Sequence, residues 1–207
     1  MHKNFICLEG IDGSGKSTQI TALEALYKNR GLEVLKIREP GGTEISEEIR
    51  AILLNSAHKG RMSNITELFL YNAARSQLIH EIIKPALESG VVVLADRFAH
   101  STLAYQGYGR GINTSMIKTL LNISCGDCMP GKTFILDLPV SLSRERQKSD
   151  QYRTGEDRIE QEKNDFFERV RMGYQAIAKE NPETCVLLDA AKAPDDIFNI
   201  LVTHLDG

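Results

Sequence analysis

The sequence predicts an α/β protein in which helices cover both faces of a five-stranded parallel sheet. Five short apolar runs have the length of buried strands, longer helical patterns lie between them, and the two kinds of segment alternate along the chain. The chain has 207 residues, of which 42% are hydrophobic and 26% charged, and these fractions are ordinary for a soluble globular protein. We therefore expect one three-layer α/β/α domain over residues 1–207, with a short lid near residues 149–157.

Each expected element follows from its pattern. Apolar runs predict strands at residues 5–8, 34–37, 91–95, 133–136 and 185–188. Amphipathic patterns predict helices at residues 16–29, 45–54, 67–87, 116–123, 141–148 and 159–179. Residues 149–157 are polar and without periodicity, which fits either a solvated connection between helices or a mobile lid, and the motifs below favour the lid.

The composition also limits the kinds of partner that we expect the protein to bind. The N-terminal residues show no signal-peptide pattern, and the chain contains no apolar run of the length that a membrane span needs. The formal net charge of −3 does not suggest a protein that coats nucleic acid. We expect a cytoplasmic protein that binds neither nucleic acid nor a membrane.

The four cysteines allow two interpretations. Cys125 and Cys128 form a CxxC pair, which is typical of a redox site or of half a zinc site. No second pair follows at a suitable spacing, so we favour two thiols in a connection between a helix and a strand. Cys7 and Cys185 lie in apolar runs and are expected in the core.

A phosphate-binding loop follows the first expected strand. The segment matches GxxxxGK[ST] at every fixed position and leads into a helical pattern. Its glycines allow backbone N–H groups to surround phosphates, and the helix start adds a positive end. Lys16 is expected to reach the β- and γ-phosphates, and the Ser17 hydroxyl to ligate Mg²⁺. The expected ATP-binding residues are Gly10, Ile11, Asp12, Gly13, Ser14, Gly15, Lys16, Ser17 and Thr18.

The loop alone does not indicate which class of nucleotide-binding protein the chain belongs to. A GTPase normally carries DxxG and NKxD segments, but no DxxG follows the loop and NKxD is absent. The chain is short for a motor domain, so a small-molecule kinase is the best remaining class. A non-catalytic nucleotide-binding regulator is an alternative, although the intact set of loop and strand-end residues argues against it.

Two charged segments follow further strands, at the sheet edge where α/β proteins bind ligands. Arg38 begins a Pro- and Gly-rich turn and suits an anion, although an arginine at a surface turn is also common. Asp96 and Arg97 end a very apolar run. Asp96 is placed to hold Mg²⁺ through water and Arg97 to bind a phosphoryl group in transfer; the alternative is a structural salt bridge.

A third segment lies on the long expected helix. Tyr71 and Arg75 are four residues apart and so share one helix face. A ring beside a guanidinium can hold a flat base by stacking and hydrogen bonding. The alternative is a helix that partly covers the core, with Arg75 in solvent.

Taken in order, the motifs EGIDGSGKST, REPGGT, NAARSQL, DRFAHSTLAYQG and DRIE resemble those of bacterial thymidylate kinases, which are P-loop nucleoside monophosphate kinases. The resemblance runs from residue 5 to about residue 189. It implies a P-loop NTPase-type fold, transfer of the ATP γ-phosphate to dTMP with Mg²⁺, and a homodimer, for which the helix over residues 67–87 is a plausible contact surface. Deoxynucleoside kinases share the opening motif and an acid–arginine pair, and are the main alternative.

The resemblance also implies roles at the dTMP site. Arg38 and Arg97 would hold the dTMP phosphate, and Asp12 would accept a hydrogen bond from the 3′-hydroxyl. Tyr71 stands where the family usually has a phenylalanine that stacks on thymine, and a tyrosine can still stack.

The remaining implied contacts concern the base and sugar. Arg75 would donate to a thymine carbonyl, and Thr102 would read the polar edge of the base. Tyr105 would pack near C2′ and disfavour a ribose, with Ser101 and Gln106 as neighbours of the substrate.

The family has one type with an arginine inside the phosphate-binding loop and another with catalytic arginines in the lid. Gly13 stands where the loop arginine would be, so the chain resembles the lid type. Arg153 is the expected catalytic arginine beside Lys16, Arg97 and Asp12, with Arg158 as the alternative. The lid is longer than the family pattern predicts.

Overall fold

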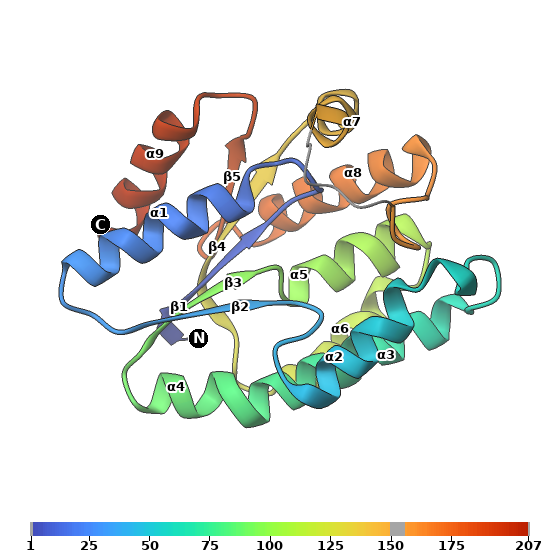
Figure 1. The fold of residues 1–207 in the computed structure, drawn as a ribbon, viewed down its shortest axis with the longest axis horizontal. Coiled ribbons are helices and arrows are strands. Elements are labelled where there is room, and N and C mark those ends of the chain that lie inside the picture. The colour runs from blue at the N-terminus through green and yellow to red at the C-terminus, as the bar shows by residue number, and fades with distance from the viewer. Residues whose placement is uncertain (1, 150–155, 207) are drawn as a thin grey trace.

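The computed structural model describes residues 2–149 and 156–206, and its centre is a parallel sheet of five strands (Figure 1). The strand order is β2-β3-β1-β4-β5. All neighbouring strands are paired in parallel, so their carboxyl ends lie along one edge. The strands are β1 (His2–Glu9), β2 (Val34–Arg38), β3 (Val92–Asp96), β4 (Pro130–Asp137) and β5 (Cys185–Asp189).

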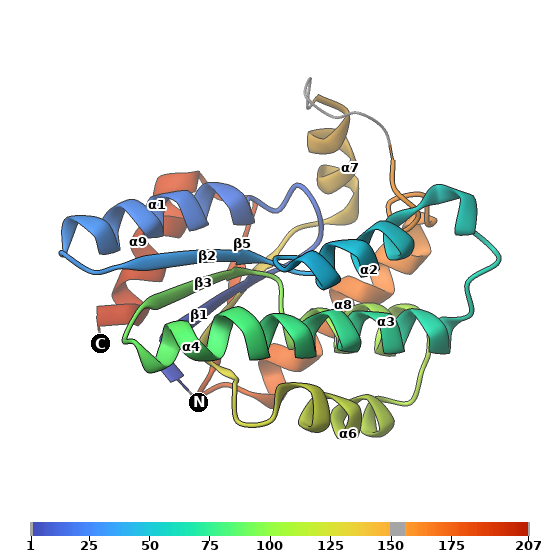
Figure 2. The same cartoon turned by 60° about the horizontal axis from the view of Figure 1, so that its bottom comes forward.

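Helices cover both faces of the sheet (Figures 1 and 2). On one face α1 (Lys16–Asn29) packs beside α9 (Pro194–Asp206). On the other face α8 (Asn164–Glu180) packs on β4 and β5, and α4 (Lys84–Glu88) on β1 and β3. The remaining helices are α2 (Glu44–Leu54), α3 (Asn64–Leu78), α5 (Ala99–Thr102), α6 (Thr114–Cys125) and α7 (Val140–Ser149), with a short 3₁₀ helix at Ser56–His58.

The core explains why the central strands read as continuous apolar runs. Residues 5–8 of β1 and 92–95 of β3 are all buried, because helices cover the sheet on both sides. Phe5 and Phe98 meet edge to face with ring centroids 5.0 Å apart in this core. The five predicted strands are confirmed, with ends that differ by a few residues.

Two predicted helices differ from the structure in extent. The helix expected at residues 67–87 begins at Asn64, and a π-helical turn at Ile79–Ile83 separates α3 from α4. The helix expected from Ile159 begins only at Asn164. The Asp157 carboxylate accepts hydrogen bonds from the backbone N–H groups of Ile159 and Glu160, which closes a separate turn before α8.

Two helical segments were not predicted. One is α5 and its continuation, a π-helical segment at Leu103–Gly109, in which small and aromatic residues hide the usual periodicity. The other is α9, which has a strong apolar face against α1. Among residues 2–149 and 156–206, no helix is both long and apolar enough to cross a membrane.

All four cysteines are free and buried. Cys125 is the last residue of α6, and Cys128 lies in the connection from α6 to β4. Burial raises the pKa of both thiols, in the case of Cys128 to about 11. Their protonated state does not suit a reactive redox pair.

Candidate functional site

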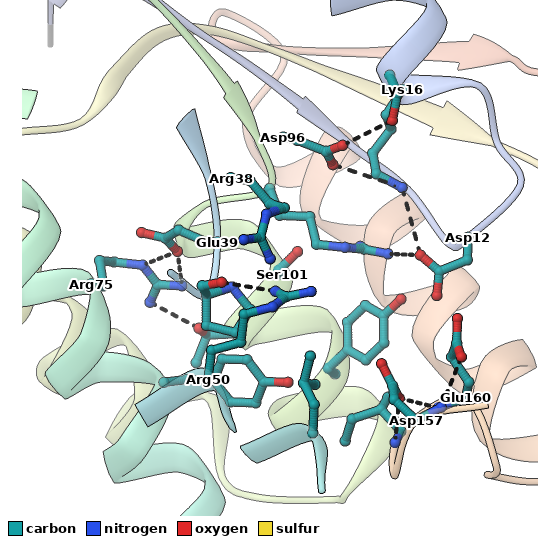
Figure 3. A pocket seen from close by; sticks show the side chains of 18 of the residues that line it. Asp12, Lys16, Arg38, Glu39, Arg50, Arg75, Asp96, Ser101, Asp157 and Glu160 are labelled. Atoms are coloured by element: carbon teal, nitrogen blue, oxygen red, sulfur yellow. Dashed lines mark hydrogen bonds and ion pairs between the residues drawn. The ribbon is translucent and has the colours of Figure 1, made fainter. Parts of the chain in front are cut away.

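A cavity of about 490 Å³ lies where the carboxyl ends of β1, β2 and β3 meet (Figure 3). It brings together segments that are far apart in the sequence, as expected for an open parallel sheet. The phosphate-binding loop contributes Asp12, Gly13, Gly15, Lys16, Ser17 and Thr18. The predicted second-substrate residues all line the same cavity: Arg38, Tyr71, Arg75, Asp96, Arg97, Ser101, Thr102, Tyr105 and Gln106.

The phosphate-binding loop has the backbone that its glycines predict. Gly10, Gly13 and Gly15 have φ values of 138°, 76° and 95°. These values are unfavourable for residues with a Cβ atom, and a Cβ on Gly10 would lie 2.6 Å from the Leu136 carbonyl oxygen. The helix α1 begins at Lys16, so its free N–H groups and positive end face the loop.

The helix α7 packs directly on this loop. Ser143 Oγ donates to the Asp12 carbonyl at 2.6 Å, and Arg146 donates to the Gly13 carbonyl at 3.0 Å. A Cβ on Gly13 would lie 3.2 Å from the Ser143 carbonyl oxygen and 3.4 Å from Arg146 Cβ. The backbone around position 13 is therefore held by α7 as well as by its own conformation.

Lys16 is a buried cation at the cavity wall. Its ammonium donates to the Gly10 carbonyl at 3.1 Å and lies 4.0 Å from both Asp12 and Asp96. Burial, and then the positive charge of Arg97, lower the pKa of Lys16. The side chain is therefore a buried cation whose present partners are groups of the loop itself and a strand-end carboxylate.

Ser17 and Asp96 lie together beside Lys16. Ser17 Oγ donates to an Asp96 carboxylate oxygen at 3.3 Å. A hydroxyl and a carboxylate are hard oxygen ligands that fit Mg²⁺, which keeps several waters and takes its other ligands from nucleotide phosphates. Within residues 2–149 and 156–206, no cluster of three or more His, Cys, Asp or Glu could hold a metal ion.

Arg97 connects the loop to the rest of the cavity. It follows β3 with a φ of 71°, which is a strained conformation for a residue other than glycine. Its guanidinium donates to the Gly10 carbonyl and to the Asp12 carboxylate, both at 2.7 Å, and stacks over the Tyr105 ring at 5.1 Å. The structural ion pair predicted as the alternative is therefore present, and it places the guanidinium at the cavity wall; binding of a phosphoryl group by Arg97 stays a prediction.

Arg75 is buried rather than in solvent, which makes that alternative wrong. Only 1% of Arg75 is exposed, because its guanidinium donates to the Glu39 carboxylate at 2.8 Å and to Thr102 Oγ1 at 2.9 Å. It also donates to the Phe98 carbonyl at 3.2 Å. Burial raises the pKa of Glu39 to about 7, although Arg75 opposes that shift. Sequence patterns did not indicate Glu39 as the partner of Arg75, since the two are 36 residues apart.

Arg38 is the exposed counterpart of Arg75. About half of its side chain is in solvent, and it donates to Glu47 at 2.9 Å. Tyr71 also lines the cavity, and burial raises the pKa of its hydroxyl, so the phenol stays protonated. Among its other groups the cavity therefore combines the half-exposed guanidinium of Arg38, the buried guanidinium of Arg75 and the neutral ring of Tyr71.

Several lining residues were missed by the sequence patterns. Arg50 extends from α2 and donates to the Pro40 carbonyl at 2.8 Å. Leu54, Asp157, Ile159 and Glu160 line the same wall. The only sequence signal for Asp157 and Glu160 was the DRIE motif, because their approach to the cavity depends on how the turn before α8 packs.

Of the two arginines predicted for the lid, only Arg158 lies in the described part of the chain. Arg158 is 4% exposed and donates to the Glu67 carboxylate at 2.7 Å and to the Leu53 carbonyl at 2.6 Å, so it anchors the turn before α8 to α2 and α3. The alternative that Arg158 reaches the phosphates is not supported by this placement. Arg153 lies outside the described residues.

The fold and the site together define a class. The site has a phosphate-binding loop after β1, an acid and an arginine at the end of β3, and further polar side chains in the same cavity. These are the parts of a P-loop enzyme that transfers phosphoryl groups between small molecules.

Comparison with known proteins makes the class specific. The family model described as thymidylate kinase matches residues 8–199. A thymidylate kinase of Desulfovibrio desulfuricans is 45% identical over 93% of this chain and 90% of its own. One of Kosmotoga olearia is 42% identical over 96% of this chain and 93% of its own. A crystal structure of thymidylate kinase from Ehrlichia chaffeensis superposes with a TM-score of 0.76 at 34% identity, covering 98% of both chains. The chain belongs to the thymidylate kinase family.

Proposed function

We propose that the protein transfers the γ-phosphate of ATP to dTMP and produces ADP and dTDP. The observation that carries this proposal is that the phosphate-binding loop and the second set of residues line one cavity (Figure 3), in which Arg97 pairs with Asp12 of the loop at 2.7 Å. Two phosphate-bearing substrates that meet end to end need cations at their junction, and this cavity supplies Lys16, Arg38 and Arg97.

At the ATP end, backbone N–H groups of the loop and Lys16 bind the β- and γ-phosphates. Ser17 and Asp96 would hold Mg²⁺, which when bound neutralises phosphate charge during transfer. A phosphate monoester is already a nucleophile near neutral pH, so the chain does not need a general base for the acceptor.

At the acceptor end, Arg38 and Arg97 bind the dTMP phosphate, and Asp12 accepts from the 3′-hydroxyl. Tyr71 stacks on the base, while Arg75 and Thr102 hydrogen-bond its polar edge. Tyr105 packs near C2′ of the sugar, with Ser101 and Gln106 beside it. The Arg75 guanidinium is held by Glu39, which supports its role as a rigid donor rather than a mobile surface charge.

We also propose that the chain acts as one domain in which residues 149–157 close over the nucleotides. Arg153 would then reach the transferred phosphoryl group, and closure would exclude water and limit ATP hydrolysis. A cytoplasmic location suits a protein that consumes ATP and dTMP.

A homodimer is supported by exposed apolar side chains on three neighbouring helices, since α2 and α6 each pack against α3. These side chains are Ile45, Ile52, Ile65, Phe69, Met116 and Ile123, each between 44% and 76% exposed. Light scattering of the wild type and of Phe69→Glu tests this: we expect a dimer for the first and a monomer for the second. A wild-type monomer at micromolar concentration would contradict the proposal.

The reaction is tested by ADP release with dTMP, dUMP, dCMP, AMP, GMP and thymidine as acceptors. We expect dTMP to give the highest kcat/KM, and thymidine to give little turnover, because it lacks the anion that Arg38 and Arg97 bind. A preference for thymidine would indicate a deoxynucleoside kinase instead. Tight ATP binding with no turnover on any acceptor would indicate a regulator.

A further inference from the structure

Tyr174 is a buried residue of α8 that lies behind the cavity wall and is not among the residues that line it. It is 2% exposed, although its hydroxyl group is polar. The hydroxyl lies 2.8 Å from a Glu9 carboxylate oxygen, 2.9 Å from Ser101 Oγ and 3.2 Å from an Arg97 nitrogen. A buried hydroxyl therefore meets three segments of the site: Glu9 at the end of β1, Arg97 directly after β3, and Ser101 of α5.

Glu9 determines the direction of these hydrogen bonds. It is fully buried, and one carboxylate oxygen accepts from the backbone N–H groups of Phe98 at 2.9 Å and Ser101 at 3.0 Å. The other oxygen accepts from Ser101 Oγ at 2.6 Å and from the Tyr174 hydroxyl. Since a carboxylate only accepts, both hydroxyl groups donate their protons to it.

This assignment leaves the Tyr174 oxygen as an acceptor. Its lone pairs face the Arg97 guanidinium, which only donates, and the contact of 3.2 Å is consistent with a hydrogen bond from Arg97 to Tyr174. The same Arg97 nitrogen also donates to the Gly10 carbonyl, and the other terminal nitrogen donates to Asp12. Gly10 and Tyr174 thus hold one edge of the guanidinium, while Asp12 holds the other terminal nitrogen.

The packing of α8 fixes the position of Tyr174. The helix lies against the segment Leu103–Gly109, and two glycines allow the close approach. A Cβ on Gly173 would lie 2.7 Å from the Tyr108 ring, and one on Gly109 would lie 2.7 Å from the Phe166 ring. The hydroxyl group of Tyr174 is therefore carried on a rigid element rather than on a loop.

We propose that Tyr174 is a positioning residue for the phosphoryl-acceptor site: with Glu9 orienting its proton, it holds the Arg97 guanidinium in the direction that the acceptor phosphate requires. This inference rests on the proposed function for the identity of the acceptor. It adds a residue of α8 to the site, and it explains why a polar group lies in an otherwise apolar helix face between Val170 and Ile177.

The test is a double-mutant cycle of Tyr174→Phe and Arg97→Ala, measured by single-turnover rates with excess enzyme and by calorimetric binding of dTMP and ATP. Tyr174→Phe removes one oxygen and keeps the ring. We expect a fall of about tenfold in kcat/KM for dTMP, the effect of one hydrogen bond to a charged group, with the ATP dissociation constant unchanged. In the Arg97→Ala background the same change should alter the single-turnover rate less than twofold, because Tyr174 acts through Arg97.

Tyr108→Phe is the matched control, because it removes a hydroxyl from the neighbouring segment, and that hydroxyl makes no hydrogen bond within the described parts of the chain. Tyr108→Phe should leave kcat/KM for dTMP and the ATP dissociation constant unchanged. A tenfold loss in both Arg97 backgrounds, or wild-type kinetics for Tyr174→Phe, would overturn the proposal. If wild type does not phosphorylate dTMP, the proposed function fails instead, and the cycle is then run with the acceptor that the ADP-release series identifies.

Discussion

The two ends of the cavity are built in different ways. The phosphate-binding loop is a continuous segment, residues 10–18, whose backbone conformation and following helix make the binding groups. The acceptor end is assembled from β2, α3, β3 and the helical segment after β3, and it depends on buried side-chain ion pairs such as Arg75 with Glu39. A local site fails when its backbone is altered, whereas an assembled site fails when one member of a charged pair is removed.

Arg97 joins the two ends, so its removal should have the largest effect. We expect Arg97→Ala to lower kcat with dTMP by about 10³-fold, as for the loss of a preorganised charge at a transferring phosphoryl group. ATP binding should persist, because the loop backbone and Lys16 remain. Steady-state ADP release and ATP calorimetry measure the two quantities, and turnover within tenfold of the wild type would contradict the bridging role.

The two arginines at the acceptor end should differ sharply in their effect on the stability of the fold. Arg75→Ala leaves Glu39 buried without its partner and should lower the free energy of unfolding by about 3–5 kcal/mol. Arg38→Ala removes only an exposed ion pair with Glu47 and should change the free energy of unfolding by less than about 1 kcal/mol. Urea denaturation compares the variants, and Arg38→Ala should still raise KM for dTMP. Equal destabilisation by both changes would contradict the difference in burial.

The loop should respond to backbone changes instead. In Gly10→Ala the new Cβ would lie against the Leu136 carbonyl and Ser14 Oγ, at a φ of 138°. We expect the free energy of unfolding to fall by about 2–4 kcal/mol and ATP to bind more weakly. Gly31→Ala is the matched control, because Gly31 also has a positive φ, of 76°, but no atom within 4 Å of the added Cβ. Gly31→Ala should lower the free energy of unfolding by about 1–2 kcal/mol and leave ATP binding unchanged. Thermal unfolding with and without ATP separates the two cases.

The smallest effect concerns protonation of Glu39. Its raised pKa of about 7 means that the carboxyl group gains a proton as pH falls below neutrality, which weakens its hold on Arg75. We expect KM for dTMP to be severalfold lower in wild type than in Glu39→Gln at pH 8.5, and the two to converge near pH 6. The second ionisation of the dTMP phosphate affects both proteins equally, so the ratio isolates Glu39. A ratio that does not change with pH would contradict this assignment.

The same contrast explains what the sequence could predict. Periodicity and motif spacing are local signals, so the five strands and the phosphate-binding loop were correctly predicted, and the ends of the first three strands marked residues at the cavity. Arg158, Glu39 and Tyr174 could not be assigned in this way, because their roles depend on partners between 36 and 165 residues away. The expected helix start at Ile159 was wrong for a related reason: Asp157 closes a local turn that competes with helix, and α8 begins only at Asn164.

The contact between α7 and Gly13 has a consequence for how such enzymes change over time. A larger residue at position 13 would bring its Cβ within 3.2 Å of the Ser143 carbonyl oxygen and 3.4 Å of Arg146 Cβ, and would have to adopt a φ of 76°. The start of α7 would then have to move by a few tenths of an ångström, and the hydrogen bond from Arg146 to the residue-13 carbonyl would have to follow. We therefore expect a relative with a larger residue at this position to differ in α7 as well, so that the two segments change together.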